Sequence, residues 1–159
     1  MGSHVLDRSN HQTGRSTPLE TRGHVAISGI FGYVLYLTKL TAEEKETVKA
    51  QCDEYRKHYD LINKGELYSL ISPWKDRTRC AWSFVSEDKS EALVTFAVIR
   101  TTVHDRYYLR LKGLDENKKY FNEQTGQVLS GRTLMRAGIC IQDKMKEFES
   151  IIYRYISVD

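Results

Sequence analysis

The sequence has no long hydrophobic run and no block of like charges. No stretch approaches the roughly 20 consecutive apolar residues of a transmembrane helix, and the N-terminus lacks the apolar segment of a secretory signal peptide. The 24 basic and 21 acidic residues are interspersed, so the net charge of +3 forms no basic stripe of the kind that binds nucleic acid. These absences predict a soluble, cytoplasmic protein that binds neither nucleic acid nor a membrane.

Cysteines are few and odd in number, and they do not form a metal or redox motif. Cys52, Cys80 and Cys140 have no Cys-x-x-Cys spacing, and two of them lie in apolar, strand-like runs. Because a disulfide would leave one thiol over, we expect buried free thiols in a reducing compartment.

Motifs of catalysis and cofactor binding are also missing. The sequence contains no P-loop, no Gly-x-Gly-x-x-Gly after a strand, no His-Glu-x-x-His and no Gly-x-Ser-x-Gly. Most acidic residues fall in predicted turns or on the outer face of a predicted helix, where carboxylates stay solvated. No carboxylate lies within an apolar strand, where burial would raise its pKa for acid catalysis. We predict no catalytic residue, no cofactor and no metal site in this chain, and the substrate-binding residues remain unknown.

The five histidines are the other candidates for chemistry. His4 and His11 share a polar N-terminal segment without a third ligand at metal spacing, which favours solvated loop histidines. Cys52 and His58 stand six residues apart on a predicted helix, nearly two turns, so packing explains them better than a thiol–imidazole pair. The remaining two are His24 and His104.

Aromatic residues are plentiful and leave two interpretations open. Exposed rings on a β-sandwich can bind the faces of sugars, whereas rings on the apolar side of a strand pack in the core. Trp82 and Tyr107 align with the apolar sides of their strands, which favours packing. The candidates are Trp74, Trp82, Tyr107, Tyr108, Tyr120, Tyr153 and Tyr155.

Two apolar runs predict a central antiparallel hairpin. In the first run Cys80, Trp82 and Phe84 share one side of the pleat. Residues 92–99 are nearly all apolar, β-branched or aromatic, as in a strand that is covered on both faces. Residues 86–90 form a polar connection of hairpin length. Such a strand needs a second layer, so the remaining elements must cover it.

Helical signals precede the hairpin. Thr17 with Glu20, and Thr41 with Glu44, form capping-box patterns that predict helices over 18–28 and 42–63. Residues 1–16 have no apolar face, so they need a neighbour or are flexible. In the longer helix the residues predicted to face inward are Val48, Cys52, Tyr55, Tyr59, Leu61 and Ile62, and those predicted to face outward include Glu54 and Lys57.

After Gly65 the pattern changes to short strands separated by turn residues. We therefore predict an α+β chain, with N-terminal helices followed by an all-β antiparallel sandwich. Outside the hairpin, strands are expected at 67–71, 107–111, 119–121, 127–129, 139–141 and 148–156, with a helical turn at 130–137.

Several segments resemble one enzyme family. They occur in the order found at the end of the catalytic barrel and in the C-terminal antiparallel β-domain of bacterial α-galactosidases of glycoside hydrolase family 36. The similarity covers essentially the whole chain. The segments are Gly2-Ser-His-Val, Asn10-His-Gln-Thr-Gly-Arg, Thr17-Pro-Leu-Glu-Thr-Arg-Gly-His-Val-Ala, Gly32-Tyr-Val-Leu-Tyr-Leu, Ala81-Trp-Ser-Phe-Val-Ser-Glu-Asp-Lys-Ser-Glu-Ala-Leu-Val, Leu109-Arg-Leu-Lys-Gly-Leu-Asp and Ser130-Gly-Arg-Thr-Leu-Met-Arg-Ala-Gly.

The resemblance implies a large, often tetrameric cytoplasmic enzyme that hydrolyses terminal α-galactosyl residues of melibiose- and raffinose-type sugars with retention. Its Asp nucleophile and Asp acid/base lie upstream of the part represented here, so neither is assigned to this chain. Pro73-Trp-Lys-Asp has the letters of the nucleophile motif in another order, and Ser86-Glu-Asp lies in the hairpin turn. Val34 and Tyr36 stand where the family tends to have acidic residues.

By this resemblance we expect the end of a (β/α)8 barrel in residues 1–40, a linking helix in 41–65 and a C-terminal antiparallel β-sandwich domain in 66–159. The chain alone would be structural and inactive. Its partners would be the missing N-terminal and barrel portions of the same enzyme and, in a homo-oligomer, further copies, with galactoside bound only by the full enzyme. Surface cut from a closed barrel would self-associate or leave residues 1–16 disordered. The alternatives are a free-standing carbohydrate-binding or interaction module and a small enzyme in its own right.

Overall fold

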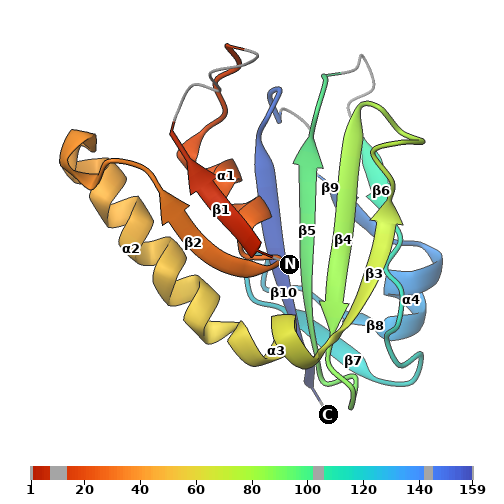
Figure 1. Cartoon of the computed structure of the whole chain (residues 1–159). Coiled ribbons are helices and arrows are strands. Elements are labelled where there is room, and N and C mark those ends of the chain that lie inside the picture. The colour runs from red at the N-terminus through yellow and green to blue at the C-terminus, as the bar shows by residue number, and fades with distance from the viewer. Residues whose placement is uncertain (1, 8–13, 102–105, 142–144, 159) are drawn as a thin grey trace.

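The computed structural model describes residues 2–7, 14–101, 106–141 and 145–158. A small β-ribbon with helices precedes a large antiparallel sheet (Figure 1). The helices are α1 (Leu19–Ala26), α2 (Ala42–Lys57), α3 (Tyr59–Lys64) and α4 (Gly131–Arg136), with a 3-10 turn η1 at Leu37–Lys39. The strands are β1 (Gly2–Leu6), β2 (Ile30–Val34), β3 (Glu66–Ile71), β4 (Arg79–Val85), β5 (Glu91–Val98), β6 (Tyr107–Leu109), β7 (Lys119–Asn122), β8 (Val128–Ser130), β9 (Ile139–Ile141) and β10 (Ser150–Val158).

The N-terminal part is a βαβ unit. β1 and β2 pair in parallel, and α1 forms the crossover between them, as parallel neighbours require. Val5 in β1 is fully buried. Residues 1–16 were expected to need a neighbour or to be flexible, and for Gly2–Leu6 the structure shows the neighbour, because pairing with β2 supplies the missing cover. Residues 8–13 lie outside the described residues.

The first helix does not begin as predicted. Pro18, with an extended ψ of 144°, occupies the N-cap position, and no side chain caps the helix. The capping box of Thr17 and Glu20 is therefore wrong. Since Pro18 itself takes the cap, the helix starts one residue later, at Leu19, and its first backbone bond runs from Arg22 N to Pro18 O over 3.1 Å.

The predicted helix over 42–63 is two helices that meet at His58. Its capping box is confirmed, since Thr41 N donates to Glu44 Oε2 over 2.9 Å and Glu44 N donates to Thr41 Oγ1 over 3.2 Å. His58 leaves helical geometry, with φ −104° and ψ 8°, while its side chain is buried. The predicted inward stripe is partly wrong: Gln51 is buried and Tyr59 is exposed, because buried polar partners shift the covered side of the helix.

The β-part is built around the predicted hairpin, which is confirmed as β4 and β5. The antiparallel order β3-β4-β5-β10-β7-β8 places this hairpin inside a six-stranded sheet. A second, two-stranded sheet pairs β6 with β9. The predicted helix-then-sandwich architecture is confirmed, because helices and the second sheet supply the cover that the buried β5 requires.

Each face of the large sheet has its own hydrophobic cluster. On one face Phe84 and Leu93 pack with Ile27, Leu61, Ile62 and Ile152, so that α1 and α3 cover the sheet. On the other face Val94 and Phe96 pack in a larger cluster with Leu109, Leu134 and Ile139, from β6, α4 and β9. The alternation of side chains in β4 predicted that the two faces of the sheet pack against different elements. The packing of the first cluster holds α1 and α3 against the sheet.

The described cysteines are free thiols, but none is buried. Cys52 and Cys80 are half-buried and Cys140 is exposed, so the predicted burial is wrong although the predicted lack of pairing holds. Cys140 lies in β9 between two inward-facing isoleucines, and the pleat turns its side chain outward. None of the helices in the described residues is long and apolar enough to cross a membrane.

Candidate functional site

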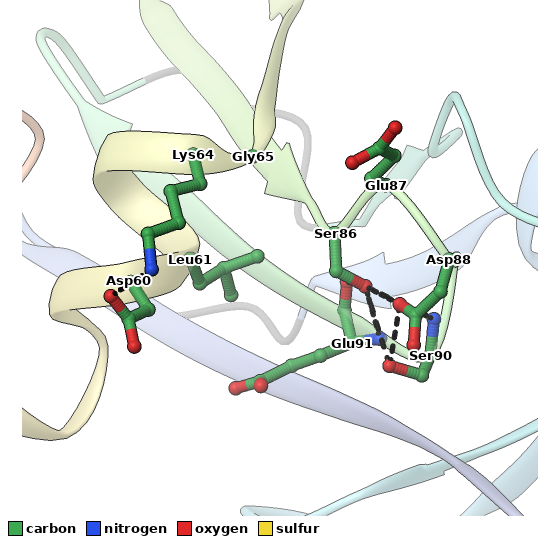
Figure 2. Close-up of a pocket in the computed structure, with 9 residues that line it drawn as sticks. All are labelled: Asp60, Leu61, Lys64, Gly65, Ser86, Glu87, Asp88, Ser90 and Glu91. Carbon is green, nitrogen blue, oxygen red and sulfur yellow. Dashed lines mark hydrogen bonds and ion pairs between the residues drawn. The ribbon is translucent and has the colours of Figure 1, made fainter.

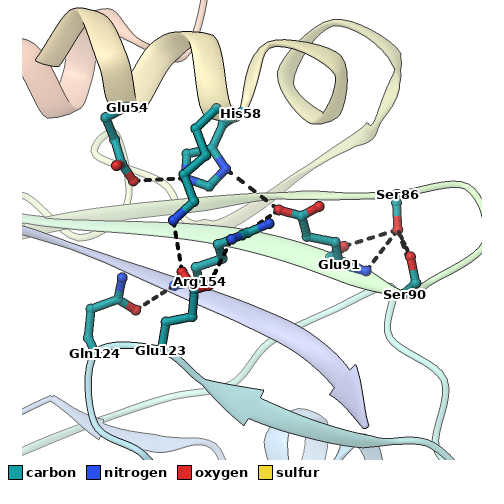
Figure 3. Close-up of polar contacts among 9 residues, drawn as sticks. Glu54, His58, Ser86, Ser90, Glu91, Glu123, Gln124 and Arg154 are labelled. Carbon is teal, nitrogen blue, oxygen red and sulfur yellow. Dashed lines mark hydrogen bonds and ion pairs between the residues drawn. The ribbon is translucent and has the colours of Figure 1, made fainter.

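A network of charged side chains joins the α2–α3 bend to the large sheet. Its members come from α2, from β5, from β10 and from the turn between β7 and β8 (Figure 3). We call it the helix–sheet joint. It consists of Glu54, Lys57, His58, Glu91, Glu123 and Arg154.

His58 lies at the centre of the joint and its side chain is completely buried. Its Nε2 lies 2.8 Å from Glu54 Oε1, one helical turn earlier. Its Nδ1 lies 3.6 Å from Glu91 Oε1, too far for a hydrogen bond, and has no hydrogen-bond partner. The hydrogen bond with His58 lowers the pKa of Glu54, so this carboxylate stays ionised. Glu54 was predicted to face outward, and its bond to a buried imidazole corrects that prediction.

Arg154 connects β10 to β5 and to the turn that follows β7. Its Nε donates to Glu91 Oε1 over 2.6 Å, and its Nη1 donates to Glu123 Oε1 over 2.8 Å. Lys57 Nζ donates to Glu123 Oε2 over 3.1 Å. Burial opposes the charge of Arg154, but the bonds to the two carboxylates raise its pKa above the usual value.

A surface pocket of about 510 Å³ opens beside the joint, between α3 and the turn from β4 to β5 (Figure 2). Asp88 accepts hydrogen bonds from Ser86 and Ser90, and these bonds lower its pKa to about 2. Lys64 pairs with Asp60 over 2.9 Å. The lining residues are Asp60, Leu61, Lys64, Gly65, Ser86, Glu87, Asp88, Ser90 and Glu91.

The carboxylates of this region are poorly suited to acid catalysis. A general acid needs a raised pKa, yet every described carboxyl group with a resolved shift, namely Glu54, Asp76, Asp88 and Glu116, has a lowered one. Among the described residues, no group of three or more His, Cys, Asp or Glu side chains could hold a metal ion. The charged side chains of the helix–sheet joint therefore act as partners in ion pairs.

The βαβ unit leaves one face of its ribbon open to solvent. On the covered face, the Phe31 ring lies 5.2 Å from that of Tyr55, and Tyr33 donates to Gln51 Oε1 over 2.7 Å. The opposite face carries Leu6, Ile30 and Val34, each more than half exposed. We call it the open ribbon face; it consists of Gly2, His4, Leu6, Ile30, Gly32 and Val34. Exposed apolar side chains on neighbouring strands are typical of a surface that a partner covers.

A separate group of hydrogen bonds, outside the helix–sheet joint, connects α1 to β10. His24 Nδ1 lies 2.8 Å from Ser150 Oγ, which donates to Thr21 Oγ1 over 3.0 Å. Burial lowers the pKa of His24 from its usual value of 6.5, although nearby Glu20 and Glu54 and the contact with Ser150 oppose the shift. The folded chain therefore keeps His24 neutral where the unfolded chain protonates it.

Replacing His24 by glutamine should reduce the loss of unfolding free energy that occurs as the pH falls below 6.5. The contribution of a buried neutral histidine is present above the unfolded pKa of 6.5 and is lost as the pH falls below it. Urea denaturation at pH 7 and pH 5 should therefore show a smaller loss of unfolding free energy in His24→Gln than in the parent chain. His4→Gln, at an exposed position, serves as the control. An unchanged loss in His24→Gln would contradict this account.

The remaining candidates from the sequence fall into different environments. His11 and His104 lie outside the described residues. Among the aromatic candidates, Trp74 is 89% exposed and Tyr108 is also exposed, whereas Tyr120, Tyr153 and Tyr155 are buried. Trp82 is half-buried and its Nε1 donates to Ser28 Oγ over 2.7 Å. The ring centroids of Tyr107 and Phe96 lie 5.9 Å apart, as the packing interpretation predicts.

Sequence reasoning missed the joint because its members are far apart in the chain. Two local signals were present. Glu54 and His58 are four residues apart, the spacing that brings helical side chains together. Arg154 interrupts an apolar strand, where an unpaired charge is not tolerated and a carboxylate partner is required.

Comparison with known proteins gives a consistent result along the chain. A family model described as Melibiase matches residues 1–65, and one described as Glycosyl hydrolase family 36 C-terminal domain matches residues 79–154. The chain is 45% identical to alpha-galactosidase AgaA of Geobacillus stearothermophilus, over 99% of this chain and 22% of that protein. It is 38% identical to the bifunctional alpha-galactosidase/sucrose kinase AgaSK of Mediterraneibacter gnavus, over 98% of this chain and 17% of that protein.

Solved structures give the same picture. The crystal structure of AgaA from Geobacillus stearothermophilus superposes with a TM-score of 0.95 at 44% identity, covering 99% of this chain and 22% of that one. The galactosidase domain of AgaSK has a TM-score of 0.95 at 38% identity, with the same coverage. The chain thus spans about a fifth of the length of the relatives that it matches.

Proposed function

Since this chain belongs to glycosyl hydrolase family 36, we propose that it is the C-terminal part of an α-galactosidase and holds the catalytic barrel in place. The reaction proposed for the whole enzyme is hydrolysis of terminal α-galactosyl residues of melibiose- and raffinose-type oligosaccharides. One relative was crystallised in complex with raffinose. The main support is the identity of 45% that extends over 99% of the chain and passes through both matched segments.

The βαβ unit supports a barrel end in residues 1–40. A (β/α)8 barrel is made of parallel strands joined by helical crossovers, which is the arrangement of β1, α1 and β2. In such a barrel one side of each strand faces the outer helices and the other faces the interior. The open ribbon face corresponds to the interior side, and its proposed partner is the preceding strands of the same enzyme. In this proposal residues 41–65 link the barrel to the β-sandwich of residues 66–159.

The proposed location is the cytoplasm, which the free thiols favour. The same proposal makes the isolated chain inactive, because it assigns no catalytic carboxylate to these residues. Assembly into a homo-oligomer would use surfaces other than the open ribbon face.

Isothermal titration calorimetry of the isolated chain with raffinose and with melibiose tests the structural role. We expect no saturable binding and no hydrolysis of a nitrophenyl α-galactoside, because the sugar-binding groups belong to the rest of the enzyme. The alternative of a carbohydrate-binding module rests on Trp74, whose exposed ring could stack on a sugar. Saturable binding that Trp74→Ala abolishes, and that Trp82→Phe retains, would favour that alternative and contradict the purely structural role.

A further inference from the structure

The two parallel strands of the βαβ unit end on the same side of the molecule. Leu6 and Val34, the last residues of β1 and β2, are paired with each other, and Figure 1 shows the two ribbons running in the same direction. In a (β/α)8 barrel the carboxyl ends of the strands and the loops after them form the face that carries the active site. The connection after β2 therefore lies on the catalytic face, a placement that rests on the proposed function, in which β1 and β2 are barrel strands.

The connection from β2 to α2 is short and internally hydrogen-bonded. Lys39 N donates to Tyr36 O over 3.0 Å, which begins the 3-10 turn η1. Leu40 N donates to Leu37 O over 3.3 Å, and Thr41 caps α2 directly afterwards. A turn that is held between a strand and a capped helix can present its side chains in a defined position.

The ring of Tyr36 projects from this turn. Tyr36 is 64% exposed, and the ammonium group of Lys39 lies 4.5 Å from the centre of its ring. A cation on one face orients the ring and leaves the opposite face to a ligand. Thr38 and Lys39 are exposed and offer a hydroxyl and an ammonium donor. An aromatic face with neighbouring donors suits a sugar, whose C–H groups pack on rings and whose hydroxyls accept hydrogen bonds.

The position of Tyr36 fits the sugar that leaves better than the galactosyl unit. An enzyme that removes a terminal sugar takes that sugar into the deepest part of its pocket, where the strands end and the catalytic residues lie. The rest of the oligosaccharide then extends outward past the connecting loops. Tyr36 follows the last residue of β2 by two positions, so its ring lies beyond the strand ends.

We propose that Tyr36 is a specificity-determining residue of the assembled enzyme and binds the sugar unit next to the terminal galactosyl unit in raffinose-type substrates. Its ring stacks on that unit, while Lys39 holds the ring from the other face. The galactosyl unit is bound by groups in the rest of the enzyme. The isolated chain is therefore still expected to show no saturable binding of raffinose, because one ring does not hold a sugar by itself.

Two substrates that differ in the leaving group test the proposal. The enzyme is a chimera in which this chain replaces the matching fifth of AgaA of Geobacillus stearothermophilus. Raffinose has a second sugar after galactose, whereas α-galactosyl fluoride releases only fluoride. Tyr36→Ala should therefore lower kcat/KM about tenfold more for raffinose than for α-galactosyl fluoride. Tyr36→Phe keeps the ring and should keep the substrate ratio of the parent chimera.

Tyr59→Ala is the matched control, since Tyr59 is another exposed tyrosine, on α3, at 52% exposure. It should leave the ratio of the two substrates as in the parent. Equal losses on both substrates in Tyr36→Ala, or the same change of ratio in Tyr59→Ala, would overturn the proposal.

The α-galactosidase assignment is tested by a different signal, which is hydrolysis of α-galactosyl fluoride by the chimera with Tyr36 intact. An inactive chimera would count against that assignment alone. AgaA that carries only residues 35–41 of this chain would then decide on Tyr36, with the same two substrates and the same expected ratio.

Discussion

Replacing Gly65 by alanine is expected to reduce the free energy of unfolding by about 3 kcal/mol, since a side chain there has no room. Gly65 stands between α3 and β3, and an added Cβ would lie 2.3 Å from Leu61 O and 2.9 Å from Val85 O. Both atoms are backbone, so α3 would have to move away from the sheet. The φ of −72° at Gly65 is ordinary, which means that close approach and not conformational freedom requires the glycine. Urea denaturation followed by circular dichroism measures the effect.

Gly126→Ala is the matched control for Gly65→Ala. Its φ of +70° makes alanine strained, but an added Cβ meets nothing within 4 Å. We expect a loss of only about 1 kcal/mol from the backbone strain. If Gly126→Ala proved the more destabilising of the two, the tight contact between α3 and the end of β4 would be in error.

Replacing Arg154 by leucine should also destabilise the chain strongly, by about 3 kcal/mol. The side chain of Arg154 is only 17% exposed and neutralises two carboxylates, those of Glu91 and Glu123. Without it, Glu123 keeps its ion pair with Lys57, and Glu91 keeps only the 3.6 Å contact with His58 Nδ1. The cost comes from carboxylates left without their partner in a poorly solvated place. Chemical denaturation at pH 7 measures the loss.

Arg136→Leu provides the comparison for Arg154→Leu. Arg136 pairs with Glu116 over 3.0 Å, but its side chain is 71% exposed. Exposed pairs contribute about 0.2–1 kcal/mol, so this variant should change stability little. A double variant, Arg154→Leu with Glu91→Leu, should recover part of the loss, because it removes one uncompensated charge together with the cation. A double variant as unstable as the sum of its singles would show that the two groups are not coupled.

The sequence predicted well those elements whose cause is local. The two hydrogen bonds of the Thr41–Glu44 capping box form within one helical turn. The alternation of side chains in β4 indicates which residues face each side of the sheet. The five polar residues between β4 and β5 define the hairpin without reference to the rest of the chain. Gly65 was correctly identified as the end of the helical region, and the physical reason is the close approach of Leu61 O and Val85 O and not a left-handed φ.

Elements that depend on distant partners were predicted less well. β1 forms because β2 and α1 cover Val5. The sequence of residues 1–16 alone gives no signal for these distant partners. The inward side of α2 is set by Gln51, which binds Tyr33 and the carbonyl of Leu19 across the helix interface. Arg154 and Glu91 lie 63 residues apart and meet only when β10 joins β5. Periodicity describes one element at a time, so a network that spans four elements is beyond its reach.

A chimera tests the central claim, that these residues are the structural C-terminal part of an α-galactosidase whose catalytic groups lie elsewhere. The chain would replace the matching fifth of AgaA of Geobacillus stearothermophilus, to which it is 45% identical. We predict that the chimera hydrolyses a nitrophenyl α-galactoside, and that Ile30→Asp on the open ribbon face abolishes this activity while Leu67→Asp on exposed β3 does not. A folded but inactive chimera, or hydrolysis by the 159-residue chain alone, would contradict the account.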